Sequence, residues 1–507
     1  MDFKKIDPTF PITAASLPNN DIELATIPKS DLPSSKKTSD PFLVEFNAQY
    51  DIHNPKDWPT GQKWAVTDVL SATGFIRIMV STIMAPALTT IANELHMTST
   101  ESAMALSIYL LATAFGPIFI GPLSEIYGRK RVLHVSNIWF LIWNIACGFA
   151  NTKRLLIAAR FLAGFGASAI YALGGGVLGD VWRPEQRGRS LGIYLLIPLL
   201  AVAVGPIIGG FMAARTTWRW MFWSTSIFQA VMVAVSFTVF RETYGPVILS
   251  RRAEKLRQST RDSRYYTTYE RLDVGKSLLA RWVQSLSRPF RLLAFHPIIQ
   301  IFSIIEGFYY GVLYIVLSGF SDLWVQQYHH SVEMSGLHYI AIASGELVGS
   351  QIGARAMDML YRRKVASSSE TGIAPESRLP LEFVAAFVAA LGLIIYGWTA
   401  QYHVHWIAVD IAIFINMMGA QIAGMPMSAY IIDSYPDHTS SAMAATQFLK
   451  SLTAFLFPLF APSLYKAIGY GWGNSSIAFA GLVLGIPAPI ILWKFGARLR
   501  AKARSSN

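Results

Sequence analysis

Twelve long apolar runs dominate this chain of 507 residues. Hydrophobic residues make up 52% of the sequence and charged residues only 15%, whereas a soluble protein has about 25% charged residues. A membrane helix needs roughly 20 apolar residues. The sequence therefore predicts an all-α membrane protein with twelve transmembrane helices, at residues 64–92, 103–124, 132–150, 155–179, 190–212, 219–240, 296–320, 335–357, 381–399, 404–428, 441–465 and 473–496.

Polar segments divide the chain into five parts. Residues 1–62 are rich in Pro, Ser, Thr, Asp and Lys, which predicts a disordered tail; Asn54 to Pro59 are expected to form a short ordered approach to the bilayer. A basic loop, 241–295, separates six runs within 63–240 from six within 296–497, and a short tail, 498–507, follows. Two equal sets of spans predict two six-helix bundles that face each other across a pathway.

Most of the Lys and Arg residues lie in the N-terminal tail, the central loop, the C-terminus and the connections between runs 2 and 3, 4 and 5, and 8 and 9. By the positive-inside rule these segments, and hence both termini, are expected to be cytosolic. The net charge of +12 then reflects orientation in a lipid bilayer rather than binding to nucleic acid. We expect a multi-pass protein of the plasma membrane.

The connection from Gly121 to Leu133 joins two apolar runs by a short basic turn. Gly121 and Gly128 allow the backbone a tight reversal, and Glu125 can accept hydrogen bonds from a helix N-terminus or from nearby cations. Arg129 and Lys130 are expected to hold the turn in water. An ordinary basic turn explains the same residues, and the sequence leaves both readings open.

Two further motifs lie inside predicted spans. Arg160 opens the segment Arg160 to Gly166 close to the end of its run, so it either faces the pathway or extends its head group to the membrane surface. Gly205, Gly209 and the residues around them form a stripe of small side chains along which another helix can approach closely. Pro206 is expected to bend this span, and Gly210 completes the motif. Plain helix packing and a gating role are both compatible with it.

These motifs, in this order, resemble those of the major facilitator superfamily, over about residues 54 to 497. Gly121 to Leu133 is similar to the signature between its second and third helices, and Gly205 to Gly210 to a motif of proton-coupled antiporters. Trp218 to Trp223 and Glu242 to Leu249 resemble the fungal twelve-span drug:proton antiporter branch. The resemblance implies an alternating-access transporter, with Glu125 and Arg129 in an inner-gate charge cluster, Arg160 in proton coupling or substrate contact, and Gly205 to Gly210 as a hinge or leak barrier.

Ionisable residues at membrane depth are costly and indicate function. The predicted spans contain Arg77, Arg160, Glu306, Glu346, Asp410 and Lys450. We expect Glu306 or Glu346 to carry a proton and to exchange it for substrate or for Lys450; a permanent structural Glu–Lys pair is the alternative. Tyr310 and Asn416 are candidate pathway residues, although packing and hydrogen bonding between helices explain them equally well.

The sequence thus predicts a proton-coupled exporter of small hydrophobic or amphipathic compounds, acting as a monomer on a small-molecule substrate and protons. An uptake transporter of the same fold is the alternative. A membrane enzyme is disfavoured because the ten histidines are scattered without matching acids. No cofactor and no metal site are expected.

Overall fold

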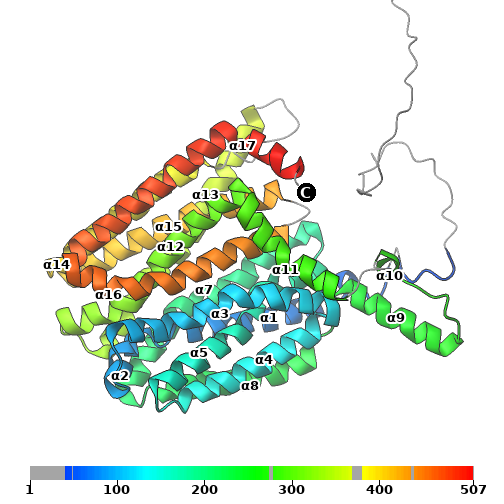
Figure 1. Cartoon of the computed structure of the whole chain (residues 1–507), viewed down its shortest axis with the longest axis horizontal. Helices are drawn as coiled ribbons and strands as arrows, with labels where there is room; N and C mark the ends of the chain where they lie inside the picture. Colours follow the sequence, from blue (N-terminus) through cyan, green and yellow to red (C-terminus); the bar gives the residue numbers. More distant parts are fainter. Residues whose placement is uncertain (1–39, 48–49, 273–277, 368–378, 436–438, 506–507) are drawn as a thin grey trace, which may run out of the picture. The chain divides into compact units, whose positions relative to one another are not determined.

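A computed structural model describes residues 40–47, 50–272, 278–367, 379–435 and 439–505. The chain divides into two units, residues 1–43 and 44–507. In the first unit, the described residues form a turn in which the amide of Leu43 donates to the carbonyl of Asp40. The predicted tail otherwise lies mostly outside the described residues. The regular structure of the second unit is helical (Figure 1).

The first six predicted spans correspond to one group of helices, coloured blue to green in Figure 1. Their bounds are α1 Thr60–Thr82, α2 Leu88–Glu94, α3 Ser99–Tyr127, α4 Arg129–Gly148, α5 Lys153–Ala167, α6 Ala169–Val181, α7 Pro184–Arg215 and α8 Arg219–Val239. Short helices follow or divide the spans: η2 (Ala85–Ala87) and α2 follow α1, and α5 and α6 together form the fourth span. Thr98 and Glu101 form a capping box that starts α3, and Thr152 caps α5.

The last six spans form the second group. Their helices are α12 Pro297–Asp322, the π-helix η3 Leu323–Gln327, α13 Val332–Ser367, α14 Pro380–Gln401, α15 Trp406–Ser434, α16 Thr439–Gly485 and α17 Pro487–Ser505. The eleventh and twelfth predicted spans meet inside α16, where Gly469 has a φ of 75°. Glycine adopts this left-handed conformation without steric cost, so the reversal between the two spans occurs at this residue.

Nine helices or helix pairs among the described residues are long and apolar enough to cross a membrane. One of them, 441–500, covers both of the last two predicted spans. The two remaining spans, α4 and α13, carry more polar residues: α4 begins with three cations, and α13 contains Glu333 and Glu346. Large apolar side chains on α4 and α8, such as Ile142 and Val231, are more than half exposed, as expected for surfaces that face lipid. The prediction of an all-α, twelve-span membrane protein is confirmed.

The central segment, expected to be a basic loop, is largely helical where it is described. It contains α9 Gly245–Thr260, α10 Thr268–Leu272 and α11 Leu278–Phe295. A short apolar cluster of Val44, Leu249 and Ala253 joins the N-terminal segment to α9. The amide of Val44 also donates a 2.8 Å hydrogen bond to the carbonyl of Tyr266.

The expected disordered tail therefore differs from the structure over residues 44–47, 50–53 and 60–62, whereas residues 54–59, expected to be ordered, contain a helical turn. The helical turn η1 (Pro55–Asp57) is capped by Asn54, and α1 begins at Thr60, inside the predicted tail. Asp51 is held by Arg252 at 2.8 Å. Polar composition indicated disorder, but contacts with a segment some 200 residues away hold these residues in place.

Candidate functional site

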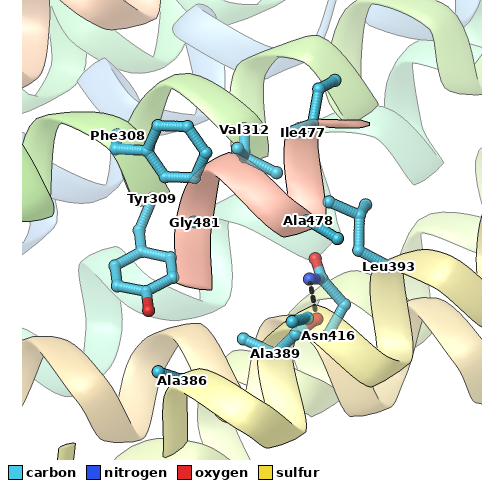
Figure 2. Close-up of a pocket in the computed structure, with 11 residues that line it drawn as sticks. Phe308, Tyr309, Val312, Ala386, Ala389, Leu393, Asn416, Ile477, Ala478 and Gly481 are labelled. Atoms are coloured by element: carbon cyan, nitrogen blue, oxygen red, sulfur yellow. Dashed lines mark hydrogen bonds between the residues drawn. The ribbon is translucent and has the colours of Figure 1, made fainter. Parts of the chain in front are cut away.

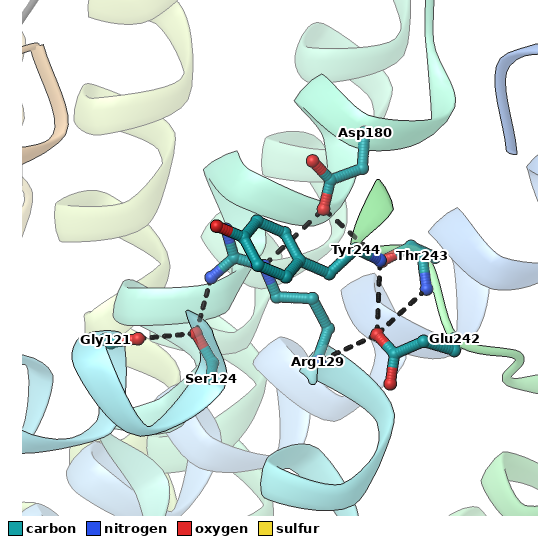
Figure 3. A network of polar contacts seen from close by, with 7 residues as sticks. All are labelled: Gly121, Ser124, Arg129, Asp180, Glu242, Thr243 and Tyr244. Atoms are coloured by element: carbon teal, nitrogen blue, oxygen red, sulfur yellow. Dashed lines mark hydrogen bonds and ion pairs between the residues drawn. The ribbon is translucent and has the colours of Figure 1, made fainter. Parts of the chain in front are cut away.

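Arg129 marks one end of the helical bundle, here called the motif end, where α3 turns into α4 (Figure 3). Its guanidinium is buried rather than solvated, which corrects the expectation that it lies in water. Nε lies 3.5 Å from Asp180 Oδ2 on α6, and Nη1 donates to the Ser124 hydroxyl. The guanidinium stacks 4.8 Å above the Tyr244 ring. Gly176 leaves room for it, because a Cβ there would lie 2.8 Å from Nη2.

Glu242, rather than Glu125, closes this cluster. Its Oε1 accepts hydrogen bonds from the main-chain amides of Arg129, Thr243 and Tyr244, at 2.8, 3.1 and 3.1 Å. A carboxylate at the first turn of α4 is stabilised by the helix dipole. Glu125 is exposed and Lys130 is half-exposed, and among the described residues neither forms an ion pair. The carboxylates that meet Arg129 come from α6 and from the segment after α8, which local sequence could not indicate.

Gly128 makes the turn between α3 and α4 possible. Its φ of 95° lies in the left-handed region, and a Cβ at this position would collide with the Glu242 carboxylate. The predicted role of Gly128 in a tight reversal is consistent with this geometry. Gly121 lies in α3, and its carbonyl accepts a 2.6 Å hydrogen bond from Ser124; a Cβ there would meet no atom within 4 Å.

Arg77 is buried inside the N-terminal group. Nη1 donates to the carbonyls of Gly166 and Ala167 at 3.2 and 3.0 Å, and Nη2 donates to Asn137 Oδ1. The side chain thus joins α1 to the C-terminal end of α5 and to α4. These are structural interactions between helices, and they use neutral oxygens instead of a carboxylate.

Arg160 is completely buried and does not extend to the membrane surface. Its guanidinium donates to the carbonyls of Val80 at 2.8 Å, Leu106 at 3.1 Å and Ala105 at 3.2 Å. It also stacks 4.8 Å from the Tyr109 ring. The sequence left open that Arg160 extends its head group to the membrane surface, and this alternative is wrong. The guanidinium instead holds α1 and α3 against α5.

The glycine motif of α7 faces two different helices. A Cβ on Gly205 would lie 3.0 Å from the carbonyl oxygen of Met79, and one on Gly209 would overlap the carbonyl of Ile83. A Cβ on Gly210 would lie 2.9 Å from the carbonyl of Val332, in the other group of helices. The predicted close helix approach is confirmed. Pro206 lies within a continuous α7, and its carbonyl would be 2.9 Å from a Cβ on Gly336 of α13.

In the second group, Glu306 of α12 and Lys450 of α16 form an ion pair. Lys450 Nζ lies 3.1 Å from Glu306 Oε2, and Ser428 donates a 2.7 Å hydrogen bond to Oε1. The Tyr310 ring centroid lies 5.3 Å from the same Nζ. The Glu306 side chain is buried, whereas the Lys450 side chain is 27% exposed. The sequence allowed Lys450 to pair with either Glu306 or Glu346. In this structure Lys450 pairs with Glu306.

Glu346 of α13 is buried and forms no ion pair or hydrogen bond with the described residues. Lys450, Tyr310 and Tyr314 lie close enough to interact with it electrostatically. Glu306, Lys450, Glu346 and Tyr310 are therefore brought together by three helices. The sequence placed these residues inside predicted spans but could not show that they share one site.

Glu382 was missed at the sequence level. It lies in the first turn of α14, is fully buried, and neither carboxylate oxygen has a hydrogen-bond partner within the described residues. Glu306 acts on it electrostatically. The signal available in the sequence was its position inside the predicted span 381–399.

Asn416 lines a small cavity between α12, α14, α15 and α16 (Figure 2). Its side-chain amide donates a 2.7 Å hydrogen bond to the carbonyl of Ala389. The cavity, lined otherwise by apolar residues such as Phe308 and Leu393, has a volume of about 10 Å³, which is room for about one water molecule. Asn416 therefore joins α14 to α15, and this cavity is too small to hold an organic substrate.

Asp410 pairs with His338, which the sequence did not suggest. His338 Nδ1 lies 2.7 Å from Asp410 Oδ2. The pair lies near the opposite end of the bundle from Arg129, here called the far end, where α12 leads into α13 and where α14 leads into α15. Asp410 is thus separate from the Glu306–Lys450 pair.

The two groups of helices also meet at the far end. Arg215 at the end of α7 forms a 2.6 Å ion pair with Glu333 at the start of α13. The Thr89 hydroxyl donates to Asp322, and the Ser321 hydroxyl donates a 2.9 Å hydrogen bond to the carbonyl of Pro86. These contacts join α2 and the η2 turn to the end of α12. A further contact between the two groups joins α3 to α16, where the Thr113 hydroxyl donates a 3.1 Å hydrogen bond to the Ser451 hydroxyl.

Comparison with known proteins shows the family to which this chain belongs. The profile of the Major Facilitator Superfamily matches residues 70–458. The chain therefore belongs to the Major Facilitator Superfamily, and it is a membrane transporter rather than an enzyme.

Individual relatives support this assignment. A probable efflux pump, mfs2, of Aspergillus flavus is 55% identical over 424 residues, covering 84% of this chain and 100% of the relative. The efflux pump vrtL of Penicillium aethiopicum is 40% identical over 92% of each chain. The partially occluded, inward-open xylose transporter XylE of E. coli shares the fold, with a TM-score of 0.61 at 15% identity over 86% of this chain and 98% of XylE.

Proposed function

We propose that this transporter exports small hydrophobic or amphipathic compounds by proton-coupled alternating access. The efflux pumps of Aspergillus flavus and Penicillium aethiopicum support export as the direction of transport, because this chain matches each of them over nearly the whole length of the pump. The observation that carries proton coupling is the buried, unpaired Glu346 beside the Glu306–Lys450 pair.

Glu346 is the group that takes up the proton in this proposal. An isolated carboxylate inside a membrane protein is costly when charged, so protonation or a cation must neutralise it at some stage of the cycle. Lys450 is bound to Glu306 here, but its side chain is partly accessible and it acts electrostatically on both acids. Lys450 can therefore move between the two carboxylates as Glu346 gains or loses its proton.

Alternating access requires the two groups of helices to separate at one end and then at the other. The far-end contacts Arg215–Glu333 and Thr89–Asp322 must break for that end to open. The close crossing of α7 and α13 at Gly210 and Gly336 supports a pivot at this point, because two facing glycines allow helices to slide with little steric obstruction. In this proposal the far end faces outward, and the motif end and both termini face the cytosol of a cell whose plasma membrane holds the protein as a monomer.

The substrate is identified by growth of yeast cells, with and without the protein, on a panel of hydrophobic toxic compounds. A compound tolerated better by expressing cells is then measured for accumulation with and without a protonophore. We expect lower accumulation in expressing cells and loss of this difference when the proton gradient collapses. Higher accumulation in expressing cells would instead indicate uptake.

Substitutions then test the proton site. We expect Glu346→Gln to abolish gradient-driven efflux while the protein still reaches the membrane, because Gln is nearly isosteric but cannot exchange a proton. We expect Glu306→Gln to impair it by freeing Lys450. Glu254→Gln, an exposed acid on α9, is the matched control and should transport normally. Unchanged efflux in both Glu346→Gln and Glu306→Gln would disprove the proposed proton site.

Epitope tags at the two termini test the orientation. Tags at both ends should be accessible to antibody only after the plasma membrane is permeabilised. Labelling of either tag on intact cells would reverse the proposed topology.

A further inference from the structure

Three titratable side chains form a hydrogen-bonded chain at the far end. His330 Nδ1 lies 3.1 Å from His338 Nε2, and His338 Nδ1 lies 2.7 Å from Asp410 Oδ2. His330 comes from the connection between η3 and α13, His338 from α13 and Asp410 from α15. His330 is half-exposed, whereas His338 is only 5% exposed. The chain therefore leads from the half-exposed His330 through the buried His338 to the partly buried carboxylate of Asp410.

Aromatic rings complete a cage around His338. The Trp324 ring stacks on the His338 ring with a centroid separation of 3.7 Å and an interplanar angle of 9°. Trp406 meets His338 edge-on at 5.6 Å. Trp324 is itself fully buried and also stacks on His330 at 5.6 Å. An indole face is the best aromatic partner for a cation, so this surrounding suits an imidazolium ion.

The hydrogen-bond geometry accommodates one added proton. In neutral His338 one ring nitrogen donates and the other accepts, which fits donation to Asp410 and acceptance from His330. When His338 is protonated, both nitrogens donate, and His330 can become the acceptor. The titratable groups that hydrogen-bond to His338 are Asp410 from α15 and His330, and the neutral rings of Trp324 and Trp406 pack against it. Tyr328, which follows η3, lies beside His330 and interacts electrostatically with Asp410.

The second histidine favours a single proton in the chain. Partial burial and the neighbouring His338 both lower the pKa of His330, against a smaller opposing effect of Asp410. Two adjacent imidazolium ions would repel each other, whereas one next to Asp410 is neutralised. His330 thus gives a proton access from the surface, His338 can bind it inside the protein, and Asp410 is the counter-ion.

We infer that His330, His338 and Asp410 form a proton-binding site at the far end, with the proton seated on His338 between Asp410 and Trp324. This site is distinct from Glu346 and Glu306. Occupancy strengthens the attachment of α13 to α15, because a neutral hydrogen bond to Asp410 becomes a charge-assisted one.

The site is connected to the contact between the two groups of helices. Glu333 and Gly336, on the same first turns of α13 as His338, contact Arg215 and α7. Protonation from the outer medium would therefore bias the position of α13 at the end that must open. This role in transport rests on the function proposed above; the proton-binding site itself does not.

Tryptophan fluorescence tests the site without any transport. A protonated imidazole stacked on an indole quenches its emission, so the purified full-length protein in detergent should show a reversible loss of fluorescence as the pH falls from mildly alkaline to mildly acidic. We expect His338→Gln to abolish this transition. Trp324→Phe should remove most of it and leave only the smaller contribution of Trp406, which meets His338 edge-on. Asp410→Asn should move it to lower pH.

The matched control is His329→Asn. His329 is exposed and adjacent to the site, and Asn tolerates its φ of 55°. We expect this variant to keep the wild-type transition. Monodisperse elution on size exclusion confirms that each variant is folded. A transition of unchanged midpoint and amplitude in folded His338→Gln would overturn the inference, as would one that persists in full in Trp324→Phe.

Efflux measured at varied external pH tests the link to transport. With a compound that the wild-type protein exports, His338→Gln should flatten the dependence on external pH, while His329→Asn should leave it unchanged. If wild-type cells export nothing, the proposed function fails while the fluorescence result still decides the site. If the fluorescence transition shows that the site titrates but His338→Gln leaves the dependence of efflux on external pH unaltered, the connection to the far-end contacts would be overturned.

Discussion

The main-chain amide of Arg129 donates a 2.8 Å hydrogen bond to Oε1 of Glu242, which lies 113 residues further along the chain. The start of α4 is therefore capped by a residue that follows α8. This contact connects the turn after α3 to the segment that leads into the central helices. It also holds the buried Arg129 guanidinium next to Asp180.

Removal of this cap should destabilise the N-terminal group. We expect Glu242→Ala to lower stability by about 1–2 kcal/mol, in the upper range for loss of a helix cap, because three amides lose their acceptor. The measurement is thermal unfolding of detergent-purified protein. Glu125→Ala, in the same turn but exposed, should stay within about 0.5 kcal/mol of the wild type. Equal losses for the two variants would contradict the assignment of Glu242 as the cap.

Packing of α7 against α1 predicts a severe effect of Gly209→Ala. The added Cβ would overlap the main-chain carbonyl of Ile83, which cannot rotate away. Overpacking of this kind costs about 1–3 kcal/mol. Gly175→Ala in α6, where a Cβ meets no atom within 4 Å, is the control. Thermal unfolding and yield of monodisperse protein measure both; similar behaviour of the two variants would refute the tight crossing.

The far-end contact between the helix groups should open and close during transport. Arg215→Cys together with Glu333→Cys allows the two positions to be joined by a short bifunctional thiol reagent. We expect the cross-linked protein to lose transport, because the far end can no longer open, and each single variant to remain active after the same treatment. The native Cys147 is buried and should not react. Full activity after complete cross-linking would contradict alternating access at this contact.

The attachment of the N-terminal segment should weaken in acid. Burial alone would raise the pKa of Asp51, but hydrogen bonds from the amides of His53 and Asn47 and the Arg252 guanidinium outweigh it and lower this pKa below 3.8. A carboxylate with a lowered pKa stabilises the folded state fully above the unfolded pKa and loses this contribution as the pH falls through the folded one. The stabilisation is therefore present near neutral pH and lost below about pH 4.

Hydrogen exchange of residues 50–58 measures this effect. Protection, corrected for intrinsic exchange rates, should decrease in the wild type as the pH falls through this range. Asp51→Asn should show weaker protection at neutral pH and little further change in acid. A wild-type segment that keeps its protection throughout would exclude Asp51 as its anchor.

Much of the architecture could be predicted from local patterns. Apolar runs of about 20 residues indicate membrane helices wherever they occur, and a glycine repeat at four-residue spacing indicates a close helix crossing. The location of Glu306 and Lys450 within helices followed from their place in apolar runs. These are properties of single segments, and they do not depend on which other segment lies beside them.

Partners could not be predicted in the same way. Arg160 and Arg77 were recognised as ionisable residues inside spans, but they bind main-chain carbonyls of neighbouring helices, which carry no signal in the sequence. His338 was one of several scattered histidines until α13 and α15 brought it to Asp410. Glu382 lay at the edge of a span and turned out to be buried.

The amino-acid sequence alone determined the membrane environment, the number and order of the spans and the family motifs, because each depends on the chemistry of contiguous residues. Only the tertiary structure decided which polar groups meet: Asp180 at the Arg129 guanidinium, Glu242 at the Arg129 amide, Glu306 at Lys450, and Asp410 at His338. The physical reason is that electrostatic and hydrogen-bond energies depend on distances between atoms a few ångströms apart, and those distances are set by how helices far apart in the chain pack together.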